Sequence, residues 1–299
     1  METILVKVPA TSANVGSGFD AAGLALGLYN TAEFSPASQL TITAADGTAV
    51  PTGTDNLVYQ AFAYLFAQAG QPVPPVRIVQ TNPIPMARGL GSSSACIVAG
   101  LLGANRMLGD RYDKNQLLDF ATKLEGHPDN VAPALLGGFV RCICDDGRVY
   151  AVRSPLDESL CFAAVIPDYP LLTTDARAVL PAQVPYQDAV FNLSRAALLQ
   201  DALCGGHPEL LPLVTQDRLH QPYRLKRMPG SDTVCAAAKQ LGALAVYLSG
   251  AGSTILVVMH RDKADAICAG LAEALGNDPA CRGFVCKRLP GDDAGAQVL

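Results

Sequence analysis

A run of glycine and serine in the middle of the chain leads directly into a segment that must lie inside the molecule. Residues 83–95 read PIPMARGLGSSSA and continue into the apolar segment 96–107. A helix that is apolar on nearly all sides has to be buried at the centre of a domain. Gly89 and Gly91 permit positive φ angles, and the serines that follow can cap the helix. The turn therefore allows two interpretations, a capped buried helix or a phosphate cradle at a helix N-terminus.

Length and composition favour a globular protein with two domains. The 299 residues exceed the size at which single cores usually stop growing. Hydrophobic residues make up 49% and charged residues 16% of the chain, which argues against disorder. The net charge of -5, without a run of lysine and arginine, argues against a nucleic acid partner. With neither a leader nor a membrane-spanning stretch in the sequence, we expect a soluble, cytoplasmic protein.

The nine cysteines are scattered along the chain, and Cys142 and Cys144 are too close for a usual metal hook. We interpret them as reduced thiols. A cysteine nucleophile would need a base that the sequence does not reveal.

The first half of the chain alternates short strands with helices. The patterns predict strands at 3–8, 40–44 and 76–80, helices at 57–69 and 113–125, and a hairpin at 137–143 and 149–153. Thr54 or Asp55 is expected to cap the first helix, and Asp113 with Gln116 forms a capping box on the second.

A second glycine-rich segment follows the first strand, which is expected to end at Pro9. Residues 14–20 read NVGSGFD, but the next glycine, Gly23, comes too late for a dinucleotide-binding fingerprint, and no helix opens there. A glycine-rich hairpin and a polar substrate loop both remain open.

Two carboxylates, an imidazole and an amide lie within six residues at the end of the second helix. These are Glu125, His127, Asp129 and Asn130. A helix C-cap with an Asx turn explains the imidazole and the amide but leaves the carboxylates unexplained. Oxygen ligands for Mg²⁺ on a bound nucleotide are the sharper interpretation.

The second half predicts a different arrangement, after a boundary near Ser154 and Pro155. Strands are expected at 160–166, 244–248, 255–259 and 284–289, and helices at 187–204, 208–219 and 262–275. With one helix inserted, the order is βαββαβ, which predicts a ferredoxin-like domain. The fold class is thus α+β, with domains at 1–154 and 155–299.

Six motifs together carry a resemblance to a known family. They are KVPATSANVGSGFDAAG, GLGSSSA, LEGHPDNVAPALLGGF, TTDARAVLP, HQPYR and LSGAGSTILVV, spread in this order from residue 7 to residue 258. The chain resembles the GHMP small-molecule kinases, and within them most closely the branch that phosphorylates L-homoserine.

The resemblance implies a reaction, a fold and partners. It implies transfer of the γ-phosphoryl group of ATP, with Mg²⁺, to the side-chain hydroxyl of L-homoserine, giving O-phospho-L-homoserine on the route to threonine. It also implies a two-domain GHMP kinase fold with the site between the domains, and it suggests a homodimer.

The resemblance also carries roles over to matching positions of this sequence. The residues expected to bind ATP are Asn56, Pro83, Arg88, Gly89, Leu90, Gly91, Ser92, Ser93, Ser94 and Ala95, and those expected to hold Mg²⁺ are Glu125 with Ser92 or Ser93. The residues expected to bind the amino acid are Asn14, Asp20, His127, Thr173, Arg177, Arg224 and Gly252. Asn130, Asp129 and Arg177 are expected to act in the reaction.

The acceptor's chemistry suits these residues. Homoserine carries an ammonium, which Asp20 can match, and a carboxylate, which Arg177 and Arg224 can bind in a fork. The branch is described as lacking a dedicated base, so Asp129 is either a base or a supporting residue. Lys7 is only a loose counterpart of the lysine that relatives use.

The glycine- and serine-rich turn at residues 83–95, called the phosphate turn below, has no Walker-type lysine, so a P-loop NTPase is excluded. Backbone N–H groups, the helix dipole and Mg²⁺ must then neutralise the phosphates, with a contribution from Arg88 left open.

Two alternatives remain. One is another GHMP kinase, of the mevalonate or sugar type. Mevalonate has a carboxylate but no ammonium, and sugars have neither group. Asp20 together with Arg177 and Arg224 therefore favours an amino acid. The other is a non-catalytic nucleotide-binding protein on the same fold.

Overall fold

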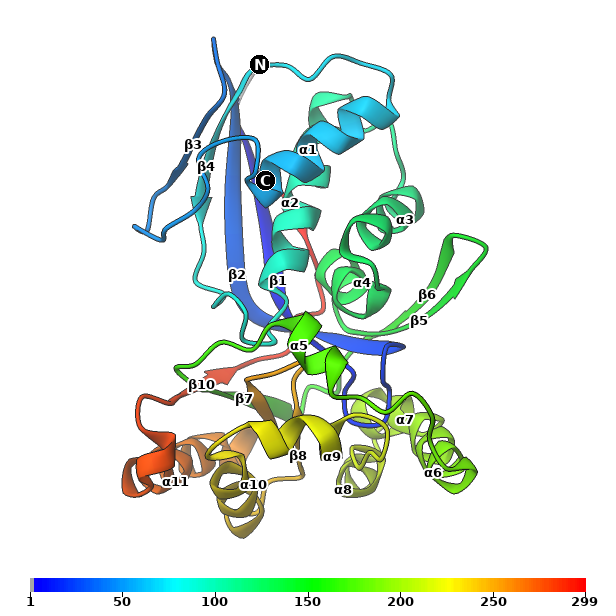
Figure 1. Ribbon diagram of the computed structural model, residues 1–299, viewed down its shortest axis with the longest axis vertical. Helices are drawn as coiled ribbons and strands as arrows, with labels where there is room; N and C mark the ends of the chain where they lie inside the picture. The colour runs from blue at the N-terminus through cyan, green and yellow to red at the C-terminus, as the bar shows by residue number, and fades with distance from the viewer. Residues whose placement is uncertain (1–2) are drawn as a thin grey trace.

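A computed structural model describes residues 3–299, which form two β-sheets with helices packed against them (Figure 1). The strands are β1 (Ile4–Ala13), β2 (Ala22–Pro36), β3 (Thr41–Ala44), β4 (Val76–Thr81), β5 (Phe139–Asp145), β6 (Arg148–Ser154), β7 (Leu160–Ile166), β8 (Ala245–Leu248), β9 (Ile255–His260), β10 (Val285–Leu289) and β11 (Gln297–Val298). The α-helices are α1 (Leu57–Gln68), α2 (Ser92–Met107), α3 (Lys114–Glu125), α4 (Pro128–Leu136), α5 (Thr173–Ala178), α6 (Tyr186–Ala196), α7 (Leu199–Cys204), α8 (Leu211–Val214), α9 (Gln221–Arg224), α10 (Ser231–Gln240) and α11 (Ala264–Asn277). Short 3₁₀ turns are η1 (Pro208–Leu210), η2 (Leu225–Arg227), η3 (Arg261–Lys263) and η4 (Pro279–Cys281).

The first sheet carries the helices α1 to α4 on one face. Its strands run in the order β11-β1-β2-β4-β3, and β5 joins β2 to β6. Figure 1 shows α2 in the middle of this helical layer, between the sheet and its neighbours. Eleven of its sixteen residues are buried, so the prediction of a central apolar helix is confirmed.

Two strands of this sheet are longer than their sequence patterns indicate. β1 continues past Pro9 to Ala13, because the pairing with β2 shifts register between Pro9 and Ala10. A bulge of this kind tolerates a proline, which cannot donate to the ladder. β2 is the longest strand in residues 3–299, and the sequence patterns did not predict a strand there. The glycine-rich segment between them is the connection of an antiparallel pair.

The second sheet has the order β10-β7-β9-β8. Along the chain, β7 is followed by several helices, then by β8 and β9, α11 and β10, which gives the predicted βαββαβ succession. The helix that fills the first crossover is α10, which the sequence analysis did not predict.

The two faces of this second sheet belong to different cores. In β7, Phe162 and Ala164 point into the hydrophobic cluster that fills the first half of the molecule. Ala163 and Val165 point the other way, into a cluster with α10 and α11. Successive side chains of a strand point to opposite faces of the sheet. One face of β7 therefore packs into the core of the first half, and the two halves share that core.

Several helix boundaries differ from the expectations. The predicted helix at 187–204 is split into α6 and α7, and the one at 208–219 is reduced to η1 and α8. The segment from His127 to Asn130 is more than a helix end, because Pro128 is the first residue of α4. Pro is well suited to that position, since the first N–H groups of a helix have no partner.

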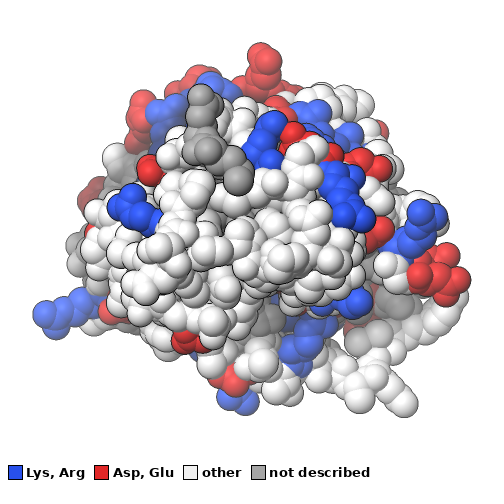
Figure 2. Space-filling view, turned by 90° about the horizontal axis from the view of Figure 1, so that it is seen from above, with Lys and Arg blue, Asp and Glu red and all other residues white. Residues whose placement is uncertain are grey.

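No helix within residues 3–299 is long and apolar enough to cross a membrane. On the face seen in Figure 2, positive and negative side chains are interspersed around a broad uncharged area.

Candidate active site

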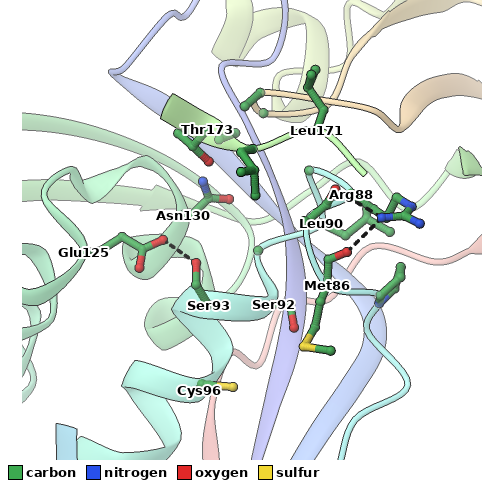
Figure 3. Close-up of a pocket in the computed structure, with 18 of the residues that line it drawn as sticks. Met86, Arg88, Leu90, Ser92, Ser93, Cys96, Glu125, Asn130, Leu171 and Thr173 are labelled. Carbon is green, nitrogen blue, oxygen red and sulfur yellow. Dashed lines mark hydrogen bonds between the residues drawn. The ribbon is translucent and has the colours of Figure 1, made fainter. Parts of the chain in front are cut away.

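A cavity of about 440 Å³ lies where the two halves meet. Its wall comes from the connection between β1 and β2, the turn before α2, the starts of α4 and α5, and residues 250–252 between β8 and β9. Figure 3 shows side chains from both halves of the chain pointing into this space. All seven residues expected to bind the amino acid line this cavity, together with Asn56 and residues 88–93 of those expected to bind ATP. Pro83, Ser94 and Ala95, also expected to bind ATP, are not among the residues that line it.

The turn before α2 offers unpaired backbone N–H groups to this cavity. The helix begins at Ser92, and its N-cap is Gly91, whose φ of 69° is left-handed and whose position provides no side-chain cap. The expectation that a serine caps the helix is therefore wrong: Ser92, Ser93 and Ser94 form the first turn itself. An uncapped N-terminus of a long helix leaves N–H donors and a partial positive charge for an anion.

Gly89 and Gly91 are needed for close approach as well as for their positive φ angles. A Cβ atom on Gly91 would lie 1.9 Å from Oγ1 of Thr11, and one on Gly89 would lie 2.2 Å from the carbonyl oxygen of Ser249. The turn is thus pressed against β1 on one side and the end of β8 on the other. The prediction that both glycines adopt positive φ angles is confirmed.

Glu125, the last residue of α3, faces the serines of this first turn. Its Oε1 atom accepts hydrogen bonds from Ser93 (2.7 Å) and Ser94 (2.8 Å). In Figure 3 the Ser92 side chain points away from Glu125, on the other side of the turn. A carboxylate and a hydroxyl beside the phosphate position are the oxygen ligands that suit Mg²⁺, which usually keeps substrate phosphates and waters as its other ligands. Within residues 3–299, no three His, Cys, Asp or Glu side chains gather into a metal-binding cluster.

The start of α4 brings three polar side chains to the cavity. Nδ1 of His127 lies 2.5 Å from Oδ1 of Asp129, and this hydrogen bond raises the pKa of the imidazole. The Asp129 side chain is buried, with 3% of its surface exposed. Asn130 accepts a hydrogen bond from the hydroxyl of Thr11 at 2.8 Å. The carboxylate suggested as a base is therefore already engaged with an imidazole.

Asp20 and Arg177, from opposite halves of the chain, form a bidentate ion pair. The two N–O distances are 2.9 Å and 3.0 Å, and the contact raises the pKa of the guanidinium. Asn14 supports the arrangement, because it accepts from the backbone N–H of Asp20 and donates to the carbonyl of Gly250. Thr173 starts α5, the helix that carries Arg177.

Arg224 is buried, with only 2% of its surface exposed, so it is not a solvated surface charge. Its guanidinium donates to the carbonyls of Ala176 and Gly250 and lies 3.4 Å from Nδ1 of His220. Burial, followed by the nearby charge of Arg177, lowers the pKa of the guanidinium. A buried cation with neutral partners is suited to a carboxylate.

Arg88 is held at the rim by backbone carbonyls. Its guanidinium donates to Pro167, Asp168 and Met86, which ties the turn before α2 to the end of β7. In Figure 3 it lies beyond Met86, away from Ser92 and Ser93. Lys7, in turn, lies with its Nζ 3.7 Å from the ring centroid of Tyr29 and is not among the described residues that line the cavity.

Asn56 is the N-cap of α1, in place of the expected Thr54 or Asp55. Its oxygen accepts from the backbone N–H groups of Val58 and Tyr59 and from the side chain of Gln80. It is buried, and so differs from a solvated residue at a helix start. Asn56 lines one end of the cavity. Residues from several separate segments line the same cavity near it, namely Val50, Pro51, Gln80, Asn82, Met86 and Cys96.

Sequence reasoning identified Asn56 but missed the other residues of this end, because single side chains from distant segments carry no motif. Burial raises the pKa of the Cys96 thiol to about 11, so it remains protonated at neutral pH. All nine cysteines are free. The last of the expected site residues, Gly252, also lines the cavity.

Comparisons with known proteins find similar sequences and structures. Residues 56–138 match the GHMP kinases N terminal domain, and residues 194–277 match the GHMP kinases C terminal domain. A homoserine kinase of Moorella thermoacetica is 45% identical over 299 residues, covering 99% of each chain. One from Synechococcus sp. is 47% identical over 270 residues, covering 88% of each. The crystal structure of a homoserine kinase from Cytophaga hutchinsonii matches with a TM-score of 0.90 at 29% identity, covering 100% of this chain and 98% of that one.

Proposed function

The chain belongs to the GHMP kinase family, and we propose that it transfers the γ-phosphoryl group of ATP to the side-chain hydroxyl of L-homoserine. The observation that carries the proposal is the arrangement of one cavity. An uncapped helix N-terminus lies at one side of it, and a carboxylate with two guanidinium groups lies at another. The first is suited to a phosphate chain, and the second to a zwitterionic amino acid.

ATP is proposed to lie along the turn before α2. The β- and γ-phosphates would accept from the N–H groups of the first turn of α2, and the base would occupy the apolar end near Asn56. Mg²⁺ would be held by Glu125 with Ser93, whose hydroxyl already contacts that carboxylate. When bound, the ion neutralises charge on the transferred phosphoryl group and on ADP.

L-homoserine is proposed to exchange partners with the pair of Asp20 and Arg177. Its ammonium would bind the Asp20 carboxylate, while its carboxylate would bind Arg177 and the buried Arg224. The Asp20 and Arg177 side chains are 37% and 46% exposed. A pair exposed to this extent is worth at most about 1 kcal/mol, so a zwitterion can replace it at little cost.

In the proposed reaction, the hydroxyl oxygen forms a bond to the γ-phosphorus while the bond to the bridging oxygen of ADP breaks. The loose transition state needs mainly positioning and charge stabilisation, so the hydroxyl proton can leave late, to a phosphoryl oxygen. The engagement of Asp129 with His127 supports this route over one with Asp129 as a dedicated base. The product, O-phospho-L-homoserine, places the enzyme on the route to threonine.

The acceptor assay tests the function directly. With ATP and Mg²⁺, we expect ADP release that depends on L-homoserine and stops when the metal is chelated, with little release on mevalonate or galactose. Turnover on mevalonate or galactose alone would show that the acceptor assignment is wrong. Thermal stabilisation by ATP without turnover on any of the three would favour a non-catalytic nucleotide-binding protein.

A homodimer is also part of the proposal. One exposed face of the hairpin of β5 and β6 presents Ile143, Tyr150 and Val152, and such apolar exposure supports a protein partner.

A further inference from the structure

The last residues of β1 contact two loops of the cavity, the segment after β8 and the phosphate turn. Ser12 accepts a hydrogen bond from the hydroxyl of Ser249, and the carbonyl of Ala13 accepts from the N–H of Gly250. The N–H of Thr11 donates to the carbonyl of Leu90 in the phosphate turn, at 3.1 Å. The strand reaches this place only because it continues past the bulge at Pro9.

Thr11 connects the phosphate turn with the start of α4. It is fully buried and does not itself line the cavity. Its Oγ1 donates to Oδ1 of Asn130 at 2.8 Å and lies where a Cβ atom on Gly91 would clash. The Thr11 side chain thus lies against the glycine at the start of α2 and contacts the amide of Asn130, which is expected to act in the reaction.

In the structure, the NH₂ end of the Asn130 amide is turned toward the cavity. Oδ1 is turned toward Thr11 and Gly91, so the NH₂ group, which has no hydrogen-bond partner within residues 3–299, is left for the cavity. Figure 3 shows the Asn130 amide between Thr173 and the phosphate turn, with its nitrogen and oxygen on different sides. An amide NH₂ group has two donors and no acceptor.

We propose that Thr11 is a positioning residue that holds the Asn130 amide with its NH₂ group directed into the cavity. Asn130 then donates to the reacting oxygen atoms and cannot take up the hydroxyl proton. The proposal rests on the proposed function for its kinetic consequences. The orientation of the amide is independent of it.

Two substitutions at the same position separate the hydroxyl from the shape of the side chain. Thr11→Val keeps the volume and removes the donor, whereas Thr11→Ser keeps the donor. We expect Thr11→Val to lower kcat by about tenfold or more, with the KM for L-homoserine nearly unchanged, because misplacing a reacting group costs mainly in the chemical step. Thr11→Ser should stay within about threefold of the wild type. Equal kcat for the valine and wild-type proteins overturns the proposal.

A double-mutant cycle tests whether Thr11 acts through Asn130. In an Asn130→Ala background, Thr11→Val should cause no further loss of kcat, whereas a purely structural role of Thr11 would make the two losses multiply. Asn130→Asp replaces the donor group with an acceptor. It should therefore lose activity, and a rate that is kept or increased would show that the residue accepts the proton.

A spectroscopic measurement needs no turnover. In ¹⁵N-labelled protein, the side-chain amide resonances of Asn130 are identified by their loss in Asn130→Asp. They should keep their position in Thr11→Ser, and shift with faster solvent exchange in Thr11→Val. If this pattern appears in a protein that does not phosphorylate L-homoserine, the proposed function is wrong and the orientation stands. If the resonances are the same in all Thr11 variants, the orientation is wrong whatever the substrate.

Discussion

The role of Arg224 follows from its surroundings in the structure and not from its residue type. In the sequence it is one of 22 lysines and arginines, and such residues are usually solvated. In the structure it is buried at the wall of the cavity, and its partners are two carbonyl oxygens and a histidine ring nitrogen. No carboxylate of the protein contacts the guanidinium within hydrogen-bonding distance in the described residues, which leaves the cation for a ligand.

We predict that Arg224→Ala lowers kcat/KM for L-homoserine by about 2–4 kcal/mol, which is about 30- to 1,000-fold, while ATP binding changes little. The reason is that truncation leaves the carboxylate of the substrate in a desolvated place without its cation. Steady-state kinetics and calorimetric titration with an ATP analogue measure the two effects. Arg227→Ala, an exposed arginine nearby on η2, is the matched control and should resemble the wild type. Equal losses for both substrates would mean that Arg224 has a structural role only.

His127 predicts a pH dependence of stability. Its pKa is raised above 6.5 by the hydrogen bond to Asp129, so the folded protein binds this proton more tightly than the unfolded chain. The contribution to stability is therefore full below pH 6.5 and is lost as the pH rises through the raised value. We expect the difference in unfolding free energy between wild type and His127→Gln, measured by urea denaturation, to shrink over that range.

The control for this prediction is the same His127→Gln substitution in an Asp129→Asn background, which removes the carboxylate that raises the pKa of His127. The pH-dependent difference should be smaller there. His220, whose pKa is lowered by burial, has the opposite sign in the wild type: its contribution is full above pH 6.5 and is lost on acidification. Because it is present in both proteins, its effect cancels in the comparison. A difference for His127→Gln that grows with pH would contradict the assignment.

At the scale of elements, the site depends on how α2 begins. A glycine at the N-cap leaves the first N–H groups unpaired, and its contact with Thr11 fixes the helix start against β1. The buried stripe of α2 then supports the turn. Each fully buried Ile, Val or Leu side chain contributes about 1.5–3 kcal/mol.

Gly91→Ala tests this arrangement. The φ of 69° is unfavourable for alanine, and the new Cβ atom would lie 1.9 Å from Oγ1 of Thr11, so the turn must move. We expect ATP affinity to fall at least about tenfold, measured by calorimetric titration, since the N–H donors would no longer converge on the phosphates.

The matched control is Gly109→Ala, which follows the same helix. Its φ is 76°, yet nothing lies within 4 Å of the added Cβ atom. It should cost about 1 kcal/mol of stability through backbone strain and leave ATP affinity unchanged. If both variants bind ATP like the wild type, the phosphates do not use this turn.

For the whole molecule, the important feature is the core that the two sheets share. Phe162 and Tyr247 of the second sheet belong to the same buried cluster as the residues of α2 and β2. β11, near the C-terminus, pairs with β1 of the first sheet. The cavity is therefore built between parts that are packed together in the absence of ligand.

We predict that the protein unfolds in one cooperative transition, because neither half can expose its side of the shared core alone. Differential scanning calorimetry should give a single peak, and Phe162→Ala should move the whole peak to lower temperature, with a loss of about 3–5 kcal/mol. Two resolved peaks, of which only one moves in Phe162→Ala, would show that the halves unfold independently.

The sequence by itself determined the elements with strong local signals. The capping box of α3, the central position of α2, the βαββαβ order and the positive φ angles of Gly89 and Gly91 all follow from short-range patterns, and each is confirmed. The two-domain GHMP kinase fold is confirmed as well, because its motifs are spread over most of the chain. The α4 helix and the continuation of β1 were missed, since prolines mark ends locally and only packing shows where they are tolerated.

Only the tertiary structure decided how the polar residues combine. Asp20 pairs with Arg177 and Thr11 donates to Asn130 across 119 or more residues of sequence, and the burial of Arg224 is a consequence of packing. No local pattern encodes them, because hydrogen bonds and burial depend on which distant segments meet. The phosphate turn depends on both levels. Its glycines are visible in the sequence, whereas the atoms that they contact belong to β1 and to the end of β8, which only the tertiary structure brings there.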